Sequence, residues 1–523
     1  MSKTFRPWKI DDPLLLPPLV ADFVAEDHLA RFVLNLVRDE IDLSAVVGSY
    51  DSDRGQPPFH PVMMTALLLY SYCCGIYASR RIAKACRERV DFMSIVALDA
   101  PDFRTVAEFR RRHLKALSGL FIQILHLCET AGLVKLGHVA LDGTKIKANA
   151  SKHKAMSYER MEKRAAELEA EVARWLAVAE ASDRAEDQRH GADKSGEEMP
   201  KWIADKKQRA ARIRKAKAEL EAEAKAAAEA KLKAAAAAQA QREAEGRKKP
   251  GRPAAPPATT PEPKAQKNFT DPESRIMKSK DGFVQAYNAQ IAVDAEAQII
   301  VAQDVTQNGT DSGQLVPMID ATEANLGHYP AQASADNGYC SEANLEALEA
   351  RNIDGYVATG RARDAVTGKA KDGDDDPPAT PPTGSAPAPQ AAPSAAEAIS
   401  PATPAPSAAE TTLPAIPAPS AAEATSPAEP DAKPKMSRVE AMRAKLKAGG
   451  HESPYRLRKQ LPEPVFGQVK QARGFRQFLM RGLEKVSGEW AIICTAHNLL
   501  KLAQGWSLPA ARPSVTLISL RAA

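Results

Sequence analysis

Residues 136–151 read Leu-Gly-His-Val-Ala-Leu-Asp-Gly-Thr-Lys-Ile-Lys-Ala-Asn-Ala-Ser and contain a short apolar run that ends on a carboxylate. A run as short as 139–141, followed by Asp142 and a Gly-Thr step, predicts a buried strand that stops at Asp142. Cations follow the acid at Lys145, Lys147, Lys152 and Lys154. An acid that can bind a metal ion, beside cations that can bind phosphate, is typical of a site that cuts nucleic acid. The motif is weak alone, because Asp-Gly is also a common hairpin turn.

Length and composition indicate a multi-domain globular protein. The chain has 523 residues, 44% hydrophobic and 26% charged, enough for two or more domains with a sizeable core. A net charge of +5 is too small to bind nucleic acid through bulk charge, so local clusters of cations are required. The six cysteines form no Cys-x-x-Cys pair, which is typical of free thiols in a reducing compartment. Without an apolar signal core or a membrane-length apolar run, the sequence predicts a cytoplasmic protein with no membrane partner.

Residues 1–130 are predicted to form an all-α N-terminal domain that binds DNA. Ser79 is expected to cap a short basic helix, and Thr105, with Glu108 three residues on, a second helix that ends at Leu117. Two short helices with one basic face each resemble a helix-turn-helix arrangement. The candidate DNA-binding residues are Arg80, Arg81, Arg87, Arg110, Arg111 and Arg112. The alternative is a solvated basic face on an ordinary helical bundle.

Inserted segments interrupt the globular pattern. Residues 157–245 carry apolar residues at alternating steps of four and three, which predicts a coiled-coil hairpin, and 246–270 are interpreted as a linker. Residues 362–435 are rich in Pro, Ala, Ser and Thr and repeat the unit Pro-Ala-Pro-Ser-Ala-Ala-Glu. This composition cannot bury a core, so the insert is predicted to be disordered. The tail 506–523 is predicted to be loose.

The remaining segments, 131–156, 271–361 and 436–505, are predicted to form one catalytic core. Runs of β type at 283–293 and 298–305 form a hairpin-like pair, and further strands are expected at 332–335 and 354–359. Helical segments separate the last two strands from their neighbours. Hairpin and crossover connections together predict an α/β fold with a mixed sheet.

Two further acids extend the site that begins at Asp142. Asp336 follows the strand 332–335, and two strand-end acids in one sheet can face each other. Glu463 lies between two prolines that suit a helix start, and Lys470, two helical turns on, is expected on the same helix face. Three carboxylates suit a two-magnesium site, because Mg²⁺ prefers oxygen ligands and retains several waters. The cations that would position a phosphate backbone are Arg456, Arg458, Lys459 and Lys470.

Taken together and in this order, these motifs resemble those of the bacterial insertion-sequence DDE transposases, which have a ribonuclease H-like catalytic core. The resembling pieces are Ala140-Leu141-Asp142-Gly143-Thr144-Lys145, Ala335-Asp336-Asn337-Gly338-Tyr339, Glu463-Pro464-Val465-Phe466-Gly467-Gln468-Val469-Lys470 with Tyr455 and the arginines before it, and the closing stretches 474–478 and 490–502. Residues 60–117 resemble the family's N-terminal helical domain. Each motif is weak alone, and the set is specific.

The resemblance implies the roles of the site residues. The family's acid triad, which is catalytic and binds the metal, maps onto Asp142, Asp336 and Glu463. Its Tyr, Arg, Glu, Lys signature maps onto Tyr455, Arg458, Glu463 and Lys470, with Lys145 a further candidate for phosphate. The commoner spacing of the signature falls on Lys459, so its basic position stays open between Arg456, Arg458 and Lys459. The implied cofactor is Mg²⁺, with Mn²⁺ as a substitute. The implied partners are the element's terminal inverted repeats, target DNA and a second copy of the chain in a homodimer on DNA.

Two other functions are alternatives at this stage. The chain could be a catalytically inactive transposase remnant that only binds DNA. It could instead be a scaffold organised by the helical hairpin, which leaves the strand-end acids unexplained. Among the other polar residues, His497 is interpreted as structural, and Asp311 as a turn or cap residue. Glu484 and Glu489 compete with Glu463 for the place of the third acid.

Overall fold

The computed structural model describes residues 19–50, 57–190, 201–244, 256–279, 282–360 and 436–506. The predicted insert 362–435 lies outside these ranges, as does nearly all of the predicted tail 506–523. Residues 1–360 and 438–523 belong to one compact unit, so the fold is described for that unit.

The N-terminal part of the chain is helical, as predicted. Its elements are η1 (Val20–Phe23), α1 (Leu29–Asp39), α2 (Ser44–Val47), α3 (Pro61–Cys73), α4 (Ser79–Glu88), α5 (Val90–Ile95), α6 (Phe103–Arg112) and α7 (Leu114–Thr130). The predicted capping box at Thr105 is wrong. Asp102 caps α6 instead, because its carboxylate accepts a hydrogen bond from the backbone N–H of Arg104 at 2.8 Å. The helix breaks at His113, so α7 is a separate helix.

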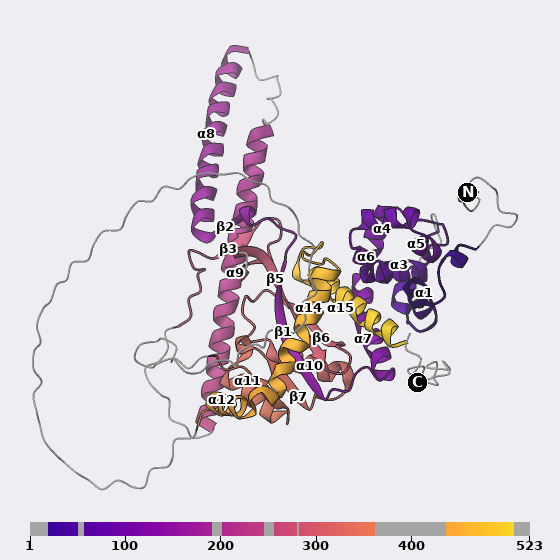
Figure 1. Cartoon of the computed structure of the whole chain (residues 1–523). Helices are drawn as coiled ribbons and strands as arrows, with labels where there is room; N and C mark the ends of the chain where they lie inside the picture. Colours follow the sequence, from indigo (N-terminus) through magenta and orange to yellow (C-terminus); the bar gives the residue numbers. More distant parts are fainter. Residues whose placement is uncertain are drawn as a thin grey trace, which may run out of the picture. The chain divides into compact units, whose positions relative to one another are not determined.

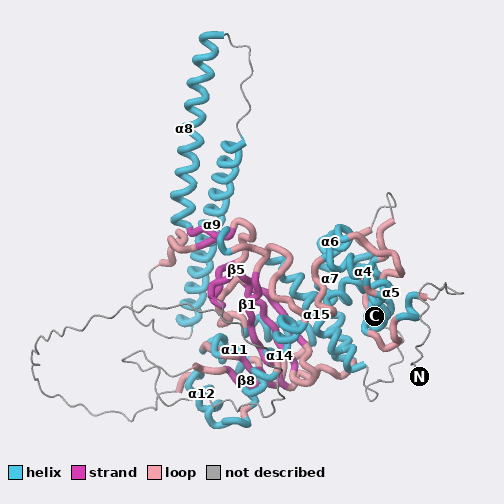
Figure 2. Tube along the Cα trace, turned by 45° about the horizontal axis from the view of Figure 1, so that its top comes forward, coloured by secondary structure: helices cyan, strands magenta, loops and turns pink. Residues whose placement is uncertain are grey.

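A mixed sheet lies at the centre of the fold, as the sequence predicts (Figure 2). Its strands are β1 (His138–Lys147), β4 (Arg275–Ser279), β5 (Gly282–Asp294), β6 (Ile300–Thr306), β7 (Gln332–Ala335) and β8 (Asp354–Val357). β5 pairs antiparallel with β1 along one edge and with β4 and then β6 along the other. On its other side β1 pairs in parallel with β7, and β7 pairs in parallel with β8.

β1 does not stop at Asp142, contrary to the prediction. It continues to Lys147 because Gly143–Lys147 pair with the antiparallel neighbour β5. The parallel pairing with β7 does end early, at Ala140 opposite Ser334. Beyond that point the β7 side of β1 has no partner strand among the described residues, and Asp142 lies there.

The helices that complete the core are α10 (Leu315–Leu326), α11 (Glu342–Ala350), α12 (Arg438–Gly449), α13 (Leu457–Gln460), α14 (Pro462–Gly467) and α15 (Leu483–Trp506). Shorter turns are η2 (Lys152–Lys154), η3 (Asn337–Tyr339), η4 (Gly450–Glu452), η5 (Pro454–Arg456) and a π-helical stretch, η6 (Gln468–Ala472). The π-helical stretch replaces part of the α-helix predicted between Glu463 and Lys470, so the two-turn spacing does not apply across it.

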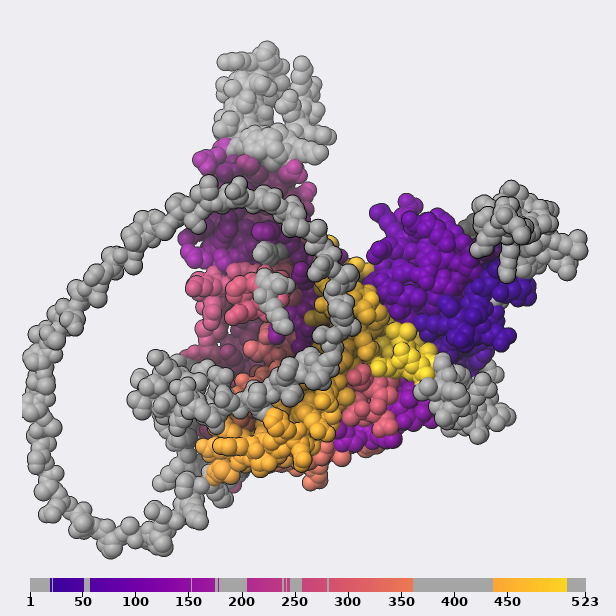
Figure 3. Space-filling view, in the orientation of Figure 1, coloured from indigo at the N-terminus to yellow at the C-terminus, as the bar shows by residue number. Residues whose placement is uncertain are grey.

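α15 joins the N-terminal helices to the sheet. It packs against β6 on one side and against α7 and α3 on another, and Figure 3 shows its yellow end beside the violet N-terminal residues. Asn498 pairs with both backbone groups of Ile300, accepting from the N–H at 2.9 Å and donating to the carbonyl at 2.8 Å. The apolar core therefore runs without a break from α3 through α15 into the sheet. The helices between residues 29 and 130 therefore share this core with the strands.

The inserted helices α8 (Tyr158–His190) and α9 (Lys201–Ala244) lie side by side (Figure 1). Their described contact is an apolar cluster built from Met161, Ala165, Leu168, Ala210, Ile213, Ala216 and Leu220. Short strands β2 (Ala155–Ser157) and β3 (Gln266–Asn268) pair antiparallel at the base of the two helices. The segment predicted as the linker 246–270 therefore contains an ordered strand, because the chain must close the base of the insert before it enters β4.

The cysteines and the lengths of the helices can be compared with the sequence. All six cysteines are free. In the described part of the chain, no helix is long and apolar enough to cross a membrane.

Glu489 on α15 is a buried carboxylate with a structural role. Its side chain accepts hydrogen bonds from the backbone N–H groups of Leu479 and Met480, each at 3.0 Å, and so fixes the loop before α15. Burial raises the pKa of Glu489 to about 7, although the backbone hydrogen bonds and the charge of Arg110 oppose the shift. Glu489 therefore does not serve as the third acid of the site.

We expect the stability of the fold to depend on pH through Glu489. An unfolded Glu titrates near 4.3, so the folded state binds this proton more tightly. The difference in unfolding free energy between wild type and Glu489→Gln should favour wild type most below about pH 4 and decline as pH rises to about 7. Urea titrations across this range measure it. Glu484→Gln, at an exposed position of the same helix, is the control and should show no such trend. A constant difference for Glu489→Gln would contradict the assignment.

Candidate active site

Asp142 and Asp336 lie on neighbouring parallel strands at the same level of the sheet. β1 and β7 pair Ala140 with Ser334, and two more steps in that register bring Asp142 opposite Asp336. Asp336 follows the last residue of β7 and caps the turn η3, accepting a hydrogen bond from the N–H of Gly338 at 2.8 Å. The sequence prediction that these two acids face each other therefore agrees with the register.

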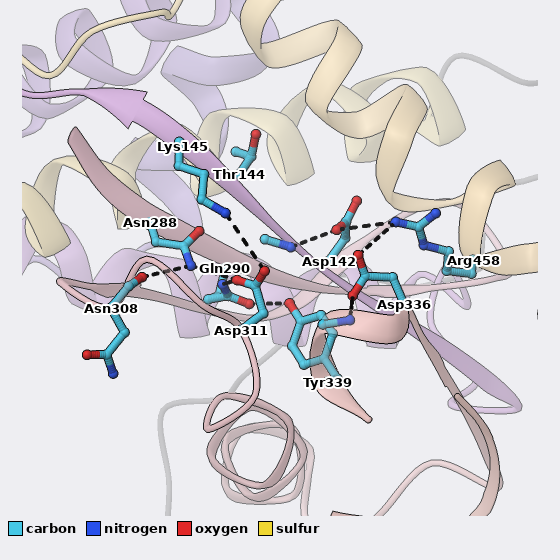
Figure 4. A network of polar contacts seen from close by, with 12 residues as sticks. Asp142, Thr144, Lys145, Asn288, Gln290, Asn308, Asp311, Asp336, Tyr339 and Arg458 are labelled. Carbon is cyan, nitrogen blue, oxygen red and sulfur yellow. Dashed lines mark hydrogen bonds and ion pairs between the residues drawn. The ribbon is translucent and has the colours of Figure 1, made fainter. Parts of the chain in front are cut away.

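Arg458 on α13 lies among the three candidate acids. Its guanidinium nitrogens are 3.8 Å from Oδ1 of Asp142, 3.4 Å from Oδ2 of Asp336 and 3.6 Å from Oε1 of Glu463. Figure 4 shows the guanidinium pointing at the two aspartates. Glu463, in the first turn of α14, is half exposed at 52%, whereas the Asp142 side chain is only 13% exposed. Acids from two strands and one helix thus converge on one cation.

The environment of Asp142 strongly perturbs its carboxyl group. Its pKa is raised to about 6, and burial is the largest cause. The charge of Arg458 and the 2.9 Å hydrogen bond from the N–H of Gly143 oppose this rise in pKa, while the neighbouring Asp336 and Asp311 contribute to it. The charge of Arg458 therefore favours the ionised form of Asp142.

Asp311 is a fourth acid near the site, and the sequence interpretation of it as a turn or cap residue missed this place. Oδ1 of Asp311 accepts hydrogen bonds from the side-chain amides of Asn288 at 2.6 Å and Gln290 at 2.7 Å (Figure 4). Gln290 also accepts a hydrogen bond from the hydroxyl of Tyr339. The signal in the sequence was the polar pair Asn288 and Gln290, which alternates along one face of an otherwise apolar strand.

The side chains of Asn288, Gln290 and Asp311, which we call the amide cluster, leave no room for a side chain at Gly143. A Cβ atom there would come within 2.2 Å of Nε2 of Gln290 and 2.6 Å of Oδ1 of Asp311. Glycine next to Asp142 therefore allows the β1 backbone to approach the amide cluster directly.

The two candidate phosphate-binding lysines are Lys145, on β1, and Lys470, which contacts β1. Nζ of Lys145 is 3.9 Å from Oδ2 of Asp311. Lys470, in the π-helical stretch, donates hydrogen bonds to the hydroxyl of Thr144 and, at 3.2 Å, to the carbonyl of Lys145. Both cations thus lie two to three residues along the strand from Asp142.

The other candidates for the signature differ from Arg458 in exposure. Arg456 and Lys459 are exposed, whereas Arg458 is directed into the acid cluster. Of the three positions that the spacing left open, Arg458 is the one in contact with the acids. Tyr455, in the turn η5, is partly buried, and its backbone N–H donates to the hydroxyl of Ser453 at 3.3 Å.

The structure corrects one of the predicted DNA-binding arginines. Arg110 is only 8% exposed, and it donates to the hydroxyl of Tyr72 at 3.0 Å and to the carbonyl of Tyr77 at 2.8 Å, so it cannot contact DNA. α6 turns this residue toward α3, and the local count of cations could not reveal that. The other five remain exposed, although Arg80 and Arg112 lie over aromatic rings and Arg111 pairs with Glu108; they are Arg80, Arg81, Arg87, Arg111 and Arg112.

The acid cluster has the right donors for a hard divalent cation, but it is arranged around a guanidinium. Within the described ranges, no group of three or more His, Cys, Asp or Glu side chains is positioned to hold a metal ion. The guanidinium of Arg458 lies within 4 Å of all three carboxylates, at the place where a shared metal ion would bind. The carboxylates of Asp142, Asp336 and Glu463 fit Mg²⁺ by chemistry once the guanidinium moves aside.

Comparison with protein families gives two matches. Residues 19–112 match a transposase domain (DUF772), and residues 424–503 match a transposase DDE domain. The first match covers the N-terminal helices, and the second contains Glu463, Arg458 and α15. No curated protein and no solved structure matches the chain.

Both matches are to transposase domains, so they support the assignment of the chain to the transposases. More specifically, they support an insertion-sequence DDE transposase, in agreement with the resemblance seen in the sequence. Asp142 and Asp336 lie outside both matches, so their assignment depends on the register and distances above.

We expect Gly143→Ala to destabilise the fold by about 1–3 kcal/mol, because the new Cβ must displace the Gln290 amide and its bond to Asp311. The measurement is the urea midpoint at constant slope. Gly137→Ala is the matched control, since a Cβ there has nothing within 4 Å and the residue precedes the same strand. Equal midpoints for the two variants would show that the amide cluster can shift with no loss of stability.

Proposed function

We propose that this chain is an active transposase that binds the terminal inverted repeats of its element, cleaves the DNA ends and joins them to target DNA. The convergence of Asp142, Asp336 and Glu463 on one guanidinium carries the proposal. The strand order β6-β5-β1-β7-β8, with the first three antiparallel and the rest parallel, supports a ribonuclease H-like core.

The carboxylates of Asp142, Asp336 and Glu463 would hold Mg²⁺, with Mn²⁺ as a substitute. Bound there, the metal would activate a water or a 3′-hydroxyl and stabilise the leaving oxygen of an in-line displacement. The described residues would act by position and charge. Asp142 and Asp336 fix one wall of the site because the sheet holds them in register. Lys145 and Lys470 would bind the phosphate beside them, and Arg458, Tyr455, Arg456 and Lys459 would hold the backbone on the α13 side.

The exposed N-terminal arginines would supply end recognition. Arg80, Arg81, Arg87, Arg111 and Arg112 lie on α4 and α6, which pack against each other. The helical hairpin would be a coiled coil, and the chain would act as a homodimer on DNA, because each element has two ends to be cut together. The proposed place of action is the cytoplasm, on nucleoid DNA.

The proposed roles of the acids predict a separation of binding from cleavage. Asp142→Asn, Asp336→Asn and Glu463→Gln should each lower Mg²⁺-dependent cleavage of end-bearing DNA at least about 100-fold, since a metal contributes several kcal/mol to the transition state. Binding of the same DNA should persist, because these acids hold metal and not bases. Gel assays of cut strands and a binding titration on each variant provide the two measurements.

Glu484→Gln is the control for the acid series, because Glu484 is exposed on α15 and outside the cluster. It should cut at the wild-type rate. Near wild-type cleavage by any one of the three acid variants would remove that residue from the site.

Arg458 is predicted to compete with the metal for the acids. Arg458→Gln should bind Mn²⁺ at least about fivefold more tightly without DNA, roughly 1 kcal/mol, because a charge within 4 Å of each carboxylate is removed. Calorimetry or the electron paramagnetic resonance of free Mn²⁺ measures this without any turnover. Arg456→Gln removes the same charge from an exposed neighbour and should leave the affinity unchanged. An unchanged or weaker affinity in Arg458→Gln would reject competition.

The placement of Arg458 also favours the alternative of an inactive, DNA-binding remnant. If the guanidinium never leaves the acids, wild type would bind end-bearing DNA without cutting it in either Mg²⁺ or Mn²⁺. The cleavage assay on wild type separates the two functions.

A further inference from the structure

α9 carries a dense run of cations. Residues 206–217 read Lys-Lys-Gln-Arg-Ala-Ala-Arg-Ile-Arg-Lys-Ala-Lys and contain no acid. A net charge of only +5 over the whole chain makes this local cluster conspicuous, since a segment of 12 residues holds seven of the cations. None of these seven cations belongs to the candidate active site.

Some of these cations are neutralised by the neighbouring helix. Acids on α8 pair with Lys206 at 2.5 Å, Arg214 at 2.8 Å and Lys217 at 2.9 Å; they are Glu171, Glu169 and Glu162. These ion pairs between α8 and α9 stabilise the helical hairpin, so these three cations have a structural role.

The remaining cations have no such role among the described residues. Lys207, Arg209, Arg212 and Lys215 are exposed, and none forms an ion pair with a residue that the structure describes. A helix turns about 100° per residue, so Lys207 and Lys215 point away from the apolar seam formed by Ile213 and Leu220.

The acids of α9 that follow this run most closely are engaged at the base of the hairpin. Glu219 and Glu223 pair with Lys267 of β3 at 2.7 and 2.8 Å, and Glu221 accepts a hydrogen bond from the hydroxyl of Tyr158 at 2.7 Å. Lys267 is only 4% exposed, so these pairs are fixed parts of the base. The run 206–217 therefore lies between one exposed acid, Asp205, and three acids that are engaged at the base.

We propose that the outer face of α9, made by Lys207, Arg212 and Lys215, binds the phosphate backbone of duplex DNA without reading its sequence. At about 100° per residue, Lys207, Lys215 and Arg212 spread over about 140° of the circumference of α9, and all three are exposed. Contacts between such cations and phosphates carry no sequence information, so this patch would bind any duplex. The inference rests on the proposed DNA substrate and adds a binding surface outside both the acid site and the N-terminal helices. Its effect is to extend the grip on DNA beyond the ends that the arginines of α4 and α6 recognise.

The test uses the full chain and a random-sequence duplex across a salt series. The triple variant Lys207→Gln, Arg212→Gln, Lys215→Gln should flatten the log–log salt dependence of binding by about 0.9 for each phosphate that the variant no longer binds, up to about 2.7. The matched control Lys163→Gln, Arg164→Gln, Arg214→Gln removes the same charge from side chains already paired with Glu159, Glu167 and Glu169. It should leave the slope close to that of wild type.

Each outcome has a distinct meaning. Equal slopes for the triple variant and wild type, or an equal flattening in both triple variants, would overturn the proposal and leave the proposed function standing. Absence of random-duplex binding by wild type would also overturn the proposal, whereas absence of binding to end-bearing DNA as well would reject the proposed function itself. A weaker helical circular dichroism signal in the triple variant would mean that the substitutions damage α9. The single variant Arg212→Gln, which removes one exposed side chain, then repeats the test, and the salt-dependence slope should flatten by about 0.9.

Discussion

The parallel pairing of β1 with β7 is the constraint on which the site depends. The pairing ends at Ala140 opposite Ser334, two residues before each aspartate, while the antiparallel pairing of β1 with β5 continues to Lys147. β1 is therefore rigid on one edge and open on the other at the level of Asp142. A strand that ended at Asp142, as predicted, would leave the carboxylate on a loop. A strand paired on both edges would leave no space for α13 and its arginine.

Once the two aspartates are fixed, charge decides the rest of the site. Burial, with a contribution from the neighbouring acids, raises the pKa of Asp142 to about 6, and a neighbouring cation opposes that rise. Arg458 supplies one, and in the proposed mechanism Mg²⁺ supplies another. The negative charge of the clustered acids attracts the guanidinium of Arg458, and in the proposed mechanism it would attract the metal ion instead.

Local patterns in the sequence predicted the elements well and the three-dimensional neighbours poorly. The runs at 283–293 and 332–335 became β5 and β7 almost residue for residue, because apolar strands are marked by composition. The extension of β1 past Asp142 escaped prediction because its polar residues are held by backbone pairing, which leaves no hydrophobic signature. Arg110 and Asp311 escaped for a related reason. Each looks like its exposed neighbours in sequence, and only its partners, Tyr72 and the amides of Asn288 and Gln290, define its role.

The described residues on either side of each long insert contact one another. The first is closed by β2 and β3, which pair Ser157 with Gln266, so the whole helical hairpin enters and leaves the fold within one strand pair. After the second, Arg438 at the start of α12 pairs with Glu346 and Glu349 of α11, and Lys445 pairs with Asp354 of β8. Loop-closure entropy grows only with the logarithm of loop length, so a few such contacts can offset a long insert. The third acid can therefore lie far along the sequence from Asp336 and still reach the same guanidinium, because α12 fixes the returning chain against β8 before α13 begins.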